Sequence, residues 1–158
     1  FPWAGSAMQK FYWVTKFLIL KAILLVGTGG FLGSVLRYSI SLSLKKVHWF
    51  GSSLPPTLLA NLLGCFLIGL LLGYSGKLSK DVVLLTTTGF CGGFTTFSTF
   101  SFESFQLLQK GDYKTALTYI LLSLVIGIVF TIAGFSLSKN LKLQIIFLIF
   151  RFHLMHVN

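Results

Sequence analysis

Charged residues, and acidic residues above all, are scarce in this chain of 158 residues. Asp, Glu, Lys and Arg make up 10% of it, whereas soluble proteins carry about 25%. Only three acids occur, too few for the paired carboxylates of hydrolytic enzymes. The two cysteines, Cys65 and Cys91, and the three histidines show no metal-ligand spacing. No nucleophile is paired with a base either, so an enzyme is not expected.

Hydrophobic residues, by contrast, make up 54% of the chain, and the mean hydropathy is +0.85. A backbone that crosses lipid must satisfy its own polar groups, which favours helices. Spans need about 20 mostly apolar residues. We therefore predict an all-α integral membrane protein with four transmembrane helices. The expected spans are Phe17–Tyr38, Leu54–Tyr74, Val82–Leu108 and Tyr113–Leu137, joined by Ser39–Ser53, Ser75–Asp81 and Gln109–Asp112.

The two ends differ from the expected four-helix membrane domain, residues 17–138. Residues 1–16 are expected to form a leader with a non-helical start, followed by a basic and aromatic stretch that suits an interfacial helix. A cleavable signal peptide is the competing interpretation, but no small-residue cleavage site follows. Residues 139–158 form a tail whose apolar patch, Ile145–Phe150, is too short to span and either lies on the membrane surface or is disordered.

The basic residues give the chain a formal net charge of +10 but only a weak orientation signal. Because they lie beside apolar runs, lipid headgroups suit them better than nucleic acid. With four spans, eight lie on the N-terminal side and five on the other; without Lys10, Lys16 and Arg151 the two sides carry five each. Such a balance permits insertion in both orientations, and hence an antiparallel, dual-topology homodimer.

Glycine and hydroxyl residues mark the third expected span as unusual. Gly89, Gly92 and Gly93 weaken a helix by roughly 1 kcal/mol each relative to alanine. A break here would free backbone carbonyls, which need burial or a partner such as a small cation. Close helix packing explains the same glycines equally well.

A polar row follows the glycines on one helical face. Thr96, Thr99, Phe100 and Glu103 lie three, four and seven residues apart, and Phe97 shares a face with Phe100. Glu103 is the only acid within an expected span, and an ionisable residue there is a functional-site hypothesis. A protonated or snorkelling glutamate near the helix end is the alternative.

Other polar residues in the spans are few. Asn61 in the second span is either interhelical glue or a donor to an anion. Arg37 is either a companion for that anion or an interfacial anchor. Tyr119 and Ser123 share a face of the fourth span.

Together these residues suit a small, strongly hydrated anion. Such an ion needs hydrogen-bond donors that replace water, and Asn61, Ser98 and Thr99 supply them. Phe97 and Phe100 offer positive ring edges and restrict size. Transport is therefore the function that the residues favour.

Three segments resemble a known family. The run Gly89–Glu103 resembles the signature of the Fluc (CrcB) fluoride channels, while Gly29–Tyr38 and Thr57–Gly64 resemble that family's first and second helices. The resemblance covers about Lys21–Leu137. It implies an antiparallel homodimer with two pores, which exports fluoride passively across the bacterial plasma (inner) membrane and relieves fluoride toxicity.

The resemblance also implies roles for individual residues. Arg37 matches an arginine placed toward the vestibule. Gly92 and Thr95 match positions whose backbone carbonyls hold a structural sodium ion at the dimer interface. The positions that match the fluoride pore are Asn61, Phe97, Ser98, Thr99, Phe100, Glu103, Tyr119 and Ser123.

Two alternatives to a channel stay open at this point. A small proton-coupled multidrug exporter also has four helices, but it depends on a glutamate in the first helix, and Phe17–Tyr38 contains no acid. A membrane scaffold would spend its polar residues wholly on helix contacts.

Overall fold

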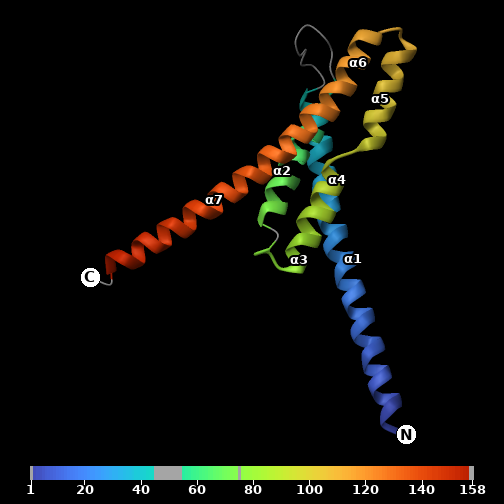
Figure 1. Ribbon diagram of the computed structural model, residues 1–158. Coiled ribbons are helices and arrows are strands. Elements are labelled where there is room, and N and C mark those ends of the chain that lie inside the picture. The colour runs from blue at the N-terminus through green and yellow to red at the C-terminus, as the bar shows by residue number, and fades with distance from the viewer. Residues whose placement is uncertain (1, 45–54, 75, 157–158) are drawn as a thin grey trace.

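The computed structural model describes residues 2–44, 55–74 and 76–156, and side chains within residues 8–141 of these ranges. Every element in the described ranges is helical (Figure 1). The elements are α1 (Pro2–Leu44), α2 (Thr57–Tyr74), α3 (Lys80–Val83), the π-helical η1 (Leu84–Cys91), α4 (Gly92–Phe94), α5 (Phe97–Gln109), α6 (Tyr113–Leu121), the π-helical η2 (Leu122–Ile126) and α7 (Gly127–His156).

Three helical segments within the described ranges are long and apolar enough to cross a membrane. They are Met8–Leu44, Thr57–Tyr74 and Tyr113–Leu141, the last running through α6, η2 and α7. The expected third span, Val82–Leu108, is not among them because it is divided into α3, η1, α4 and α5. The all-helical architecture that the sequence predicts is confirmed.

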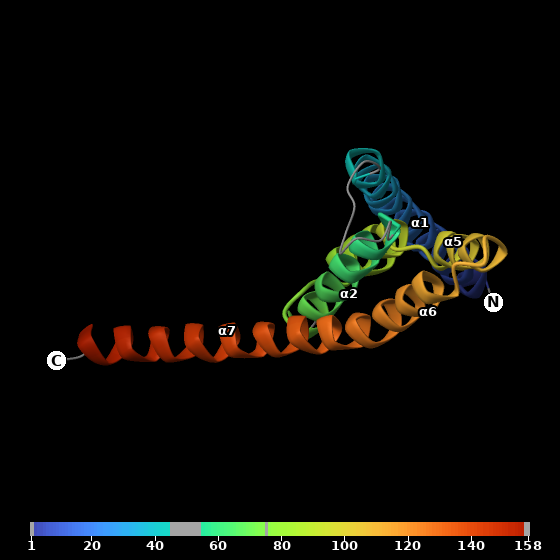
Figure 2. The same cartoon turned by 90° about the horizontal axis from the view of Figure 1, so that it is seen from above.

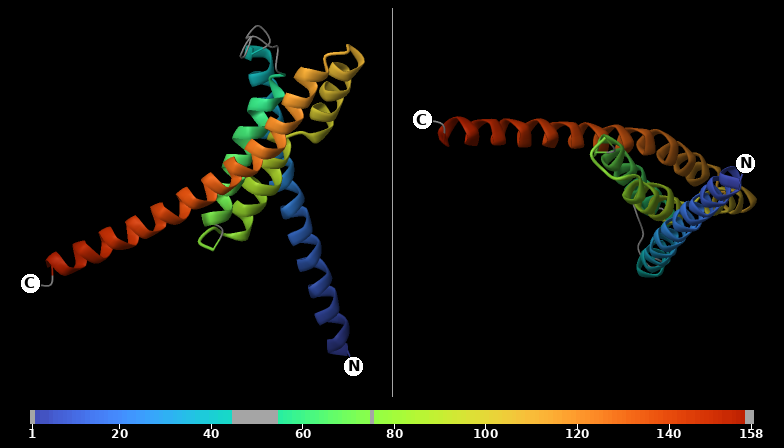
Figure 3. Two further views of the ribbon diagram at one scale, coloured as in Figure 1. Left: turned by 45° about the horizontal axis from the view of Figure 1, so that its top comes forward. Right: turned by 90° about the horizontal axis from the view of Figure 1, so that it is seen from below.

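The helices form a small central bundle from which two long helices diverge. α2 and the α3–η1–α4 segment lie in the middle, and α5 and α6 form a hairpin at one end (Figure 1). The N-terminal part of α1 and the C-terminal part of α7 leave the bundle in different directions (Figures 2 and 3).

Glycines bring the backbones of the bundle into contact. A Cβ at Gly29 or Gly33 of α1 would overlap a carbonyl oxygen of η1, that of Leu85 or Phe90. In the same way, a Cβ at Gly69 of α2 would overlap the Thr131 carbonyl of α7. Small residues at such crossings are the usual means of helix association in lipid. The glycine packing that the sequence left as one possibility therefore exists, on α1 and α2 as well as on the third span.

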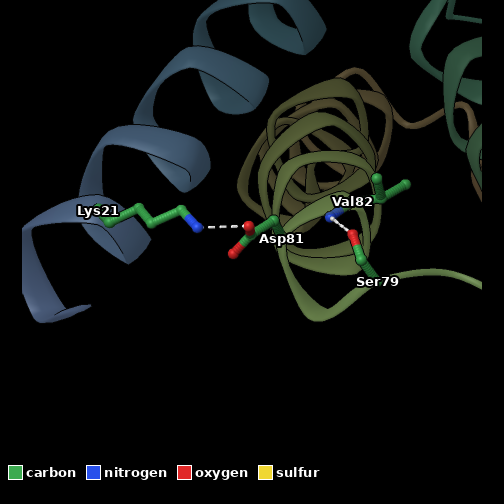
Figure 4. Close-up of polar contacts among 4 residues, drawn as sticks. All are labelled: Lys21, Ser79, Asp81 and Val82. Atoms are coloured by element: carbon green, nitrogen blue, oxygen red, sulfur yellow. Dashed lines mark hydrogen bonds and ion pairs between the residues drawn. The ribbon is translucent and has the colours of Figure 1, made fainter.

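A surface ion pair marks the end of the bundle opposite the α5–α6 hairpin. Lys21 Nζ of α1 contacts Asp81 Oδ2 of α3, and both side chains are about half exposed (Figure 4). α3 begins there because Ser79 caps it, accepting a hydrogen bond from the Val82 amide at 3.3 Å. A charged pair of this kind belongs near the polar headgroups rather than in the hydrocarbon.

The ends of the chain differ from the sequence prediction. The first residues were expected to be non-helical, but α1 begins at Pro2, because proline suits the first helical position and nothing after it breaks the helix. α1 also continues past Tyr38 to Leu44, and α7 continues through the expected tail to His156. No helix ends at residue 16 or 138, because α1 and α7 run through these positions. The division of the chain into residues 1–16, 17–138 and 139–158 therefore stays a prediction.

Candidate functional site

The candidate site is built around a two-residue interruption of the third segment. Thr95 (φ −91°, ψ 154°) and Thr96 (φ −150°, ψ 120°) are extended, and α5 begins directly after them. The glycines that the sequence predicts to break the helix are themselves helical. The break follows them, where the amides of Thr96 and Thr99 donate to side chains instead of to backbone carbonyls of the preceding turn. Two β-branched residues accept the extended conformation readily.

Asn61 of α2 holds the interruption in place. Its Oδ1 accepts a hydrogen bond from the Thr96 amide at 2.9 Å, and its Nδ2 donates to the Thr96 carbonyl at 3.2 Å. The side-chain amide thus replaces the helical partners that an extended residue lacks. An unpaired backbone group in this environment would be costly, so Asn61 stabilises the broken conformation.

The side chain of Thr96 starts the next helix. Its Oγ1 accepts from the Thr99 amide at 3.3 Å and lies 3.1 Å from Ser98 Oγ and 3.2 Å from Thr99 Oγ1. Such a cap satisfies one of the free amides at a helix start. Three hydroxyls therefore gather at the first turn of α5.

Two backbone carbonyls at the interruption lose their helical donors as a result. The Thr96 amide donates to Asn61 instead of to the Gly92 carbonyl, and the Thr99 amide donates to Thr96 Oγ1 instead of to the Thr95 carbonyl. The Gly93 carbonyl is different, because it accepts from Arg37 Nε at 3.3 Å and from Ser34 Oγ at 3.4 Å. Carbonyl oxygens without donors are suited to a hard cation.

Glu103 connects three elements farther along α5. Its Oε1 accepts from Thr57 Oγ1 of α2 and its Oε2 accepts from Tyr119 OH of α6, both at 2.8 Å. Thr57 and Tyr119 are buried. Because these two hydrogen bonds come from buried donors on different helices, Glu103 fixes α5 between α2 and α6.

Aromatic rings lie between the hydroxyls and Glu103. The Phe100 ring centroid is 5.6 Å from that of Phe97 and 5.2 Å from that of Tyr119, which it meets edge to face. Tyr119 is fully buried, Phe100 is half-buried and Phe97 is 76% exposed. The row of rings therefore runs from the interior to the surface.

An open groove of about 580 Å³ runs beside the interruption. Ser123 of η2 lines it, and its hydroxyl is the one buried side-chain polar atom without a hydrogen bond among the described residues. The lining includes Asn61, Gly92, Thr95, Thr96, Phe97, Phe100 and Ser123. No group of three His, Cys, Asp or Glu side chains able to hold a metal occurs in the described part of the chain.

Comparisons with known proteins show which family the sequence belongs to. Residues 24–135 match the family model "CrcB-like protein, Camphor Resistance (CrcB)". The chain belongs to the CrcB-like family. A relative from Azobacteroides pseudotrichonymphae is 46% identical over 125 residues, which are 77% of this chain and 98% of the relative. One from Leptospira interrogans is 47% identical over 128 residues, 76% of this chain and 96% of that protein. Another from Gloeobacter violaceus is 46% identical over 129 residues, which are 78% of this chain and 100% of that protein. All three are named "Fluoride-specific ion channel FluC".

The CrcB-like segment contains every site residue that the sequence predicts, and most of them lie together. Asn61, Phe97, Phe100, Ser123 and the two proposed cation ligands line the groove. Ser98 and Thr99 adjoin it through Thr96, and Glu103 and Tyr119 through the Phe100 ring. Arg37 lies apart from the groove lining, with its Nε on the Gly93 carbonyl.

The sequence prediction missed Thr57 of this CrcB-like site, and it placed Thr96 in the polar row without giving it a role in the site. Thr57 precedes Asn61 by four positions and so shares its helical face, a signal that was present. Nothing local distinguishes Thr96 from the neighbouring threonines, because its role depends on Asn61 of another helix.

Proposed function

We propose that this chain forms a passive, fluoride-selective ion channel that exports fluoride across the bacterial inner membrane and relieves fluoride toxicity. The observation that carries the proposal is the row of hydrogen-bond donors and phenylalanine edges beside the interruption of the third segment. Membership of a family whose relatives are named fluoride-specific ion channels supports fluoride as the ion. The same membership makes this chain a channel component rather than an enzyme.

The donors of the groove replace the water of a hydrated anion. Asn61 spends one Nδ2 hydrogen on the Thr96 carbonyl and keeps a second one. The Ser123 hydroxyl is free to donate, and the hydroxyls of Ser98 and Thr99 rotate to suit. Phe97 and Phe100 contribute ring edges, which carry positive partial charge.

Both oxygens of Glu103 are occupied as hydrogen-bond acceptors, so its side chain is held in one position. Each oxygen accepts a hydrogen bond, from Thr57 and from Tyr119. Both donors stabilise the carboxylate in place and turn it toward the interior. This use of Glu103 as a fixed acceptor favours a channel over a proton-coupled exporter, whose acid must release its proton in each cycle.

A second, antiparallel copy completes the path. In one chain Phe97 is largely exposed, the groove is open and Gly92 has free space where a side chain would stand. The near-balance of basic residues between the two membrane sides permits opposite insertions. In this arrangement α1, α2, the interrupted α3–α5 segment and α6–α7 are the four membrane-spanning elements of each copy.

A sodium ion at the dimer interface fits the carbonyls of Gly92 and Thr95. Both oxygens have lost their helical donors, and Gly92 is exposed. Hard cations prefer such oxygen ligands. When bound, the ion stabilises the interruption by balancing the carbonyl dipoles, while Asn61 holds the adjoining Thr96 backbone.

Fluoride efflux from liposomes tests the channel. Vesicles that contain the purified chain are expected to release their fluoride far faster than protein-free vesicles loaded in the same way, and to retain their chloride. Replacing Phe100→Ile removes the ring that contacts both Phe97 and Tyr119 and is expected to reduce efflux at least tenfold. Phe102→Ile, on the same helix and 59% exposed, is the matched control and keeps wild-type efflux.

Absence of fluoride release above protein-free vesicles would refute the channel. Glu103→Gln separates the exporter from it: proton-coupled transport collapses, whereas passive fluoride efflux persists in part, because a glutamine oxygen still accepts one hydrogen bond. If the chain dimerises but wild type, Phe100→Ile and Phe97→Ile all release fluoride no faster than protein-free vesicles, a scaffold role gains support instead.

A further inference from the structure

The N-terminal arm, defined as residues Met8–Leu20 of α1, lies outside the segment that matches the family. We propose that this arm binds anionic phospholipid headgroups at the membrane surface. The inference does not depend on fluoride transport, because the arm contributes no residue to the groove.

The arm stands clear of the bundle. Every side chain from Met8 to Leu20 is exposed, including Phe11 at 73% and Phe17 at 67%. The described contacts of α1 with the bundle begin at Lys21, which pairs with Asp81, and continue at the glycines that meet η1 and α4 (Figure 4). Figure 3 shows the N-terminal half of α1 leaving the other helices.

The length of α1 places the arm beyond the hydrocarbon layer. The apolar segment Met8–Leu44 has 37 residues, or about 55 Å at 1.5 Å per residue, whereas the hydrocarbon core is about 30 Å thick. With the Lys21–Asp81 pair at the headgroups, the arm adds about 20 Å on the outer side of that level. Left upright in water, the arm would expose its large apolar side chains, so the headgroup boundary is its favourable environment.

The chemistry of the arm selects anionic lipid within that boundary. Lys16 Nζ lies 5.6 Å from the Trp13 ring centroid and 5.8 Å from that of Tyr12, and the two rings meet edge to face. Trp and Tyr of this kind sit at headgroup level. No acidic residue precedes Asp81 in the sequence, and Asp81 is paired with Lys21. The charges of Lys10 and Lys16 are therefore left for lipid phosphates.

Quenching of Trp13 by brominated lipids tests the proposal. The full chain carries Trp3→Phe and Trp49→Phe, so that Trp13 is the sole tryptophan. It is reconstituted in mixed phosphatidylcholine and phosphatidylglycerol vesicles, with bromine on the acyl chains of one lipid or the other. Brominated phosphatidylglycerol is expected to quench Trp13 more strongly at equal mole fraction. Each lysine is expected to enrich phosphatidylglycerol beside the arm about fivefold over its bulk fraction. This enrichment is expected to fall when the salt concentration is raised to about 0.5 M.

Charge-matched variants identify the residues responsible. Lys10→Gln with Lys16→Gln is expected to abolish the preference, whereas Lys110→Gln with Lys114→Gln, at the α5–α6 end of the bundle, retains it. Equal quenching by the two brominated lipids, or a preference that survives loss of Lys10 and Lys16, would overturn the proposal. Fluoride efflux from the same vesicles reports separately on the channel and on correct folding.

Discussion

Asn61→Ala is the substitution that most directly probes the interruption of the third segment. It removes both hydrogen bonds that hold the Thr96 backbone, at 2.9 and 3.2 Å, and leaves the Thr96 amide and carbonyl without these partners. Interhelical hydrogen bonds in membranes contribute about 0.6 kcal/mol each on average and about 1.7 kcal/mol at most. Two of them imply a loss of about 1–3 kcal/mol in the free energy of unfolding.

A second substitution, Asn61→Asp, tests the hydrogen bond to the Thr96 carbonyl. Asn61→Asp keeps an oxygen that accepts from the Thr96 amide but replaces the donor that meets the Thr96 carbonyl, so oxygen faces oxygen there. Its stability is expected to be no higher than that of Asn61→Ala, because repulsion offsets the retained bond. Both variants are also expected to lower fluoride efflux, since each removes an N–H donor from the groove.

Reversible unfolding in mixed detergent micelles measures the stability change. The matched control is Leu63→Ala, on the same helix but with an exposed side chain, which is expected to change stability by less than about 0.5 kcal/mol. If Asn61→Ala unfolds with the wild-type midpoint, the two hydrogen bonds do not hold the interruption and the reasoning is wrong.

Three further predictions concern packing and partners. Tyr119→Phe and Thr57→Val each leave one Glu103 oxygen without its donor, so each is expected to cost about 1–2 kcal/mol in the same unfolding assay; wild-type stability of both single variants would contradict a stabilising role of these hydrogen bonds. The Cβ of Gly33→Ala would overlap the Phe90 carbonyl, so this variant is expected to destabilise the fold by more than about 1 kcal/mol. Its control, Gly27→Ala, has open space around it and is expected to be neutral or stabilising. Equal effects of the two substitutions on stability would refute the glycine packing. Replacing sodium by N-methyl-glucamine throughout purification is expected to lower the unfolding midpoint and the fraction of dimers, and an unchanged midpoint would argue that the free carbonyls bind no cation.

The sequence was most informative where a local signal decides the structure. α2 begins at Thr57, just after Pro55 and Pro56, and the connection between α5 and α6 lies where Gly111 adopts a positive φ of 75° and Asp112 caps the next helix. The expected connection Gln109–Asp112 agrees with these bounds to within one residue. Prolines, glycines and capping residues act over a few positions, so a sequence reports them directly.

The interruption itself depends on contacts that no local pattern contains. Glycines marked the neighbourhood, but the extended residues are Thr95 and Thr96, because Asn61 of α2 supplies the partners for the Thr96 backbone. Likewise, helical spacing brought Glu103 near the phenylalanines, whereas its bonds to Thr57 and Tyr119 require the packing of three helices. The extra length of α1 and α7 was missed because span lengths were set from the bilayer thickness, and an apolar helix does not have to end there.

Current through a planar bilayer that contains the purified chain tests the central claim most directly. With fluoride on one side, chloride on the other and a common impermeant cation, the account predicts a current whose reversal potential follows the fluoride gradient and is insensitive to chloride. A current that reverses according to the chloride gradient, or no current at all from correctly folded dimers, would contradict it.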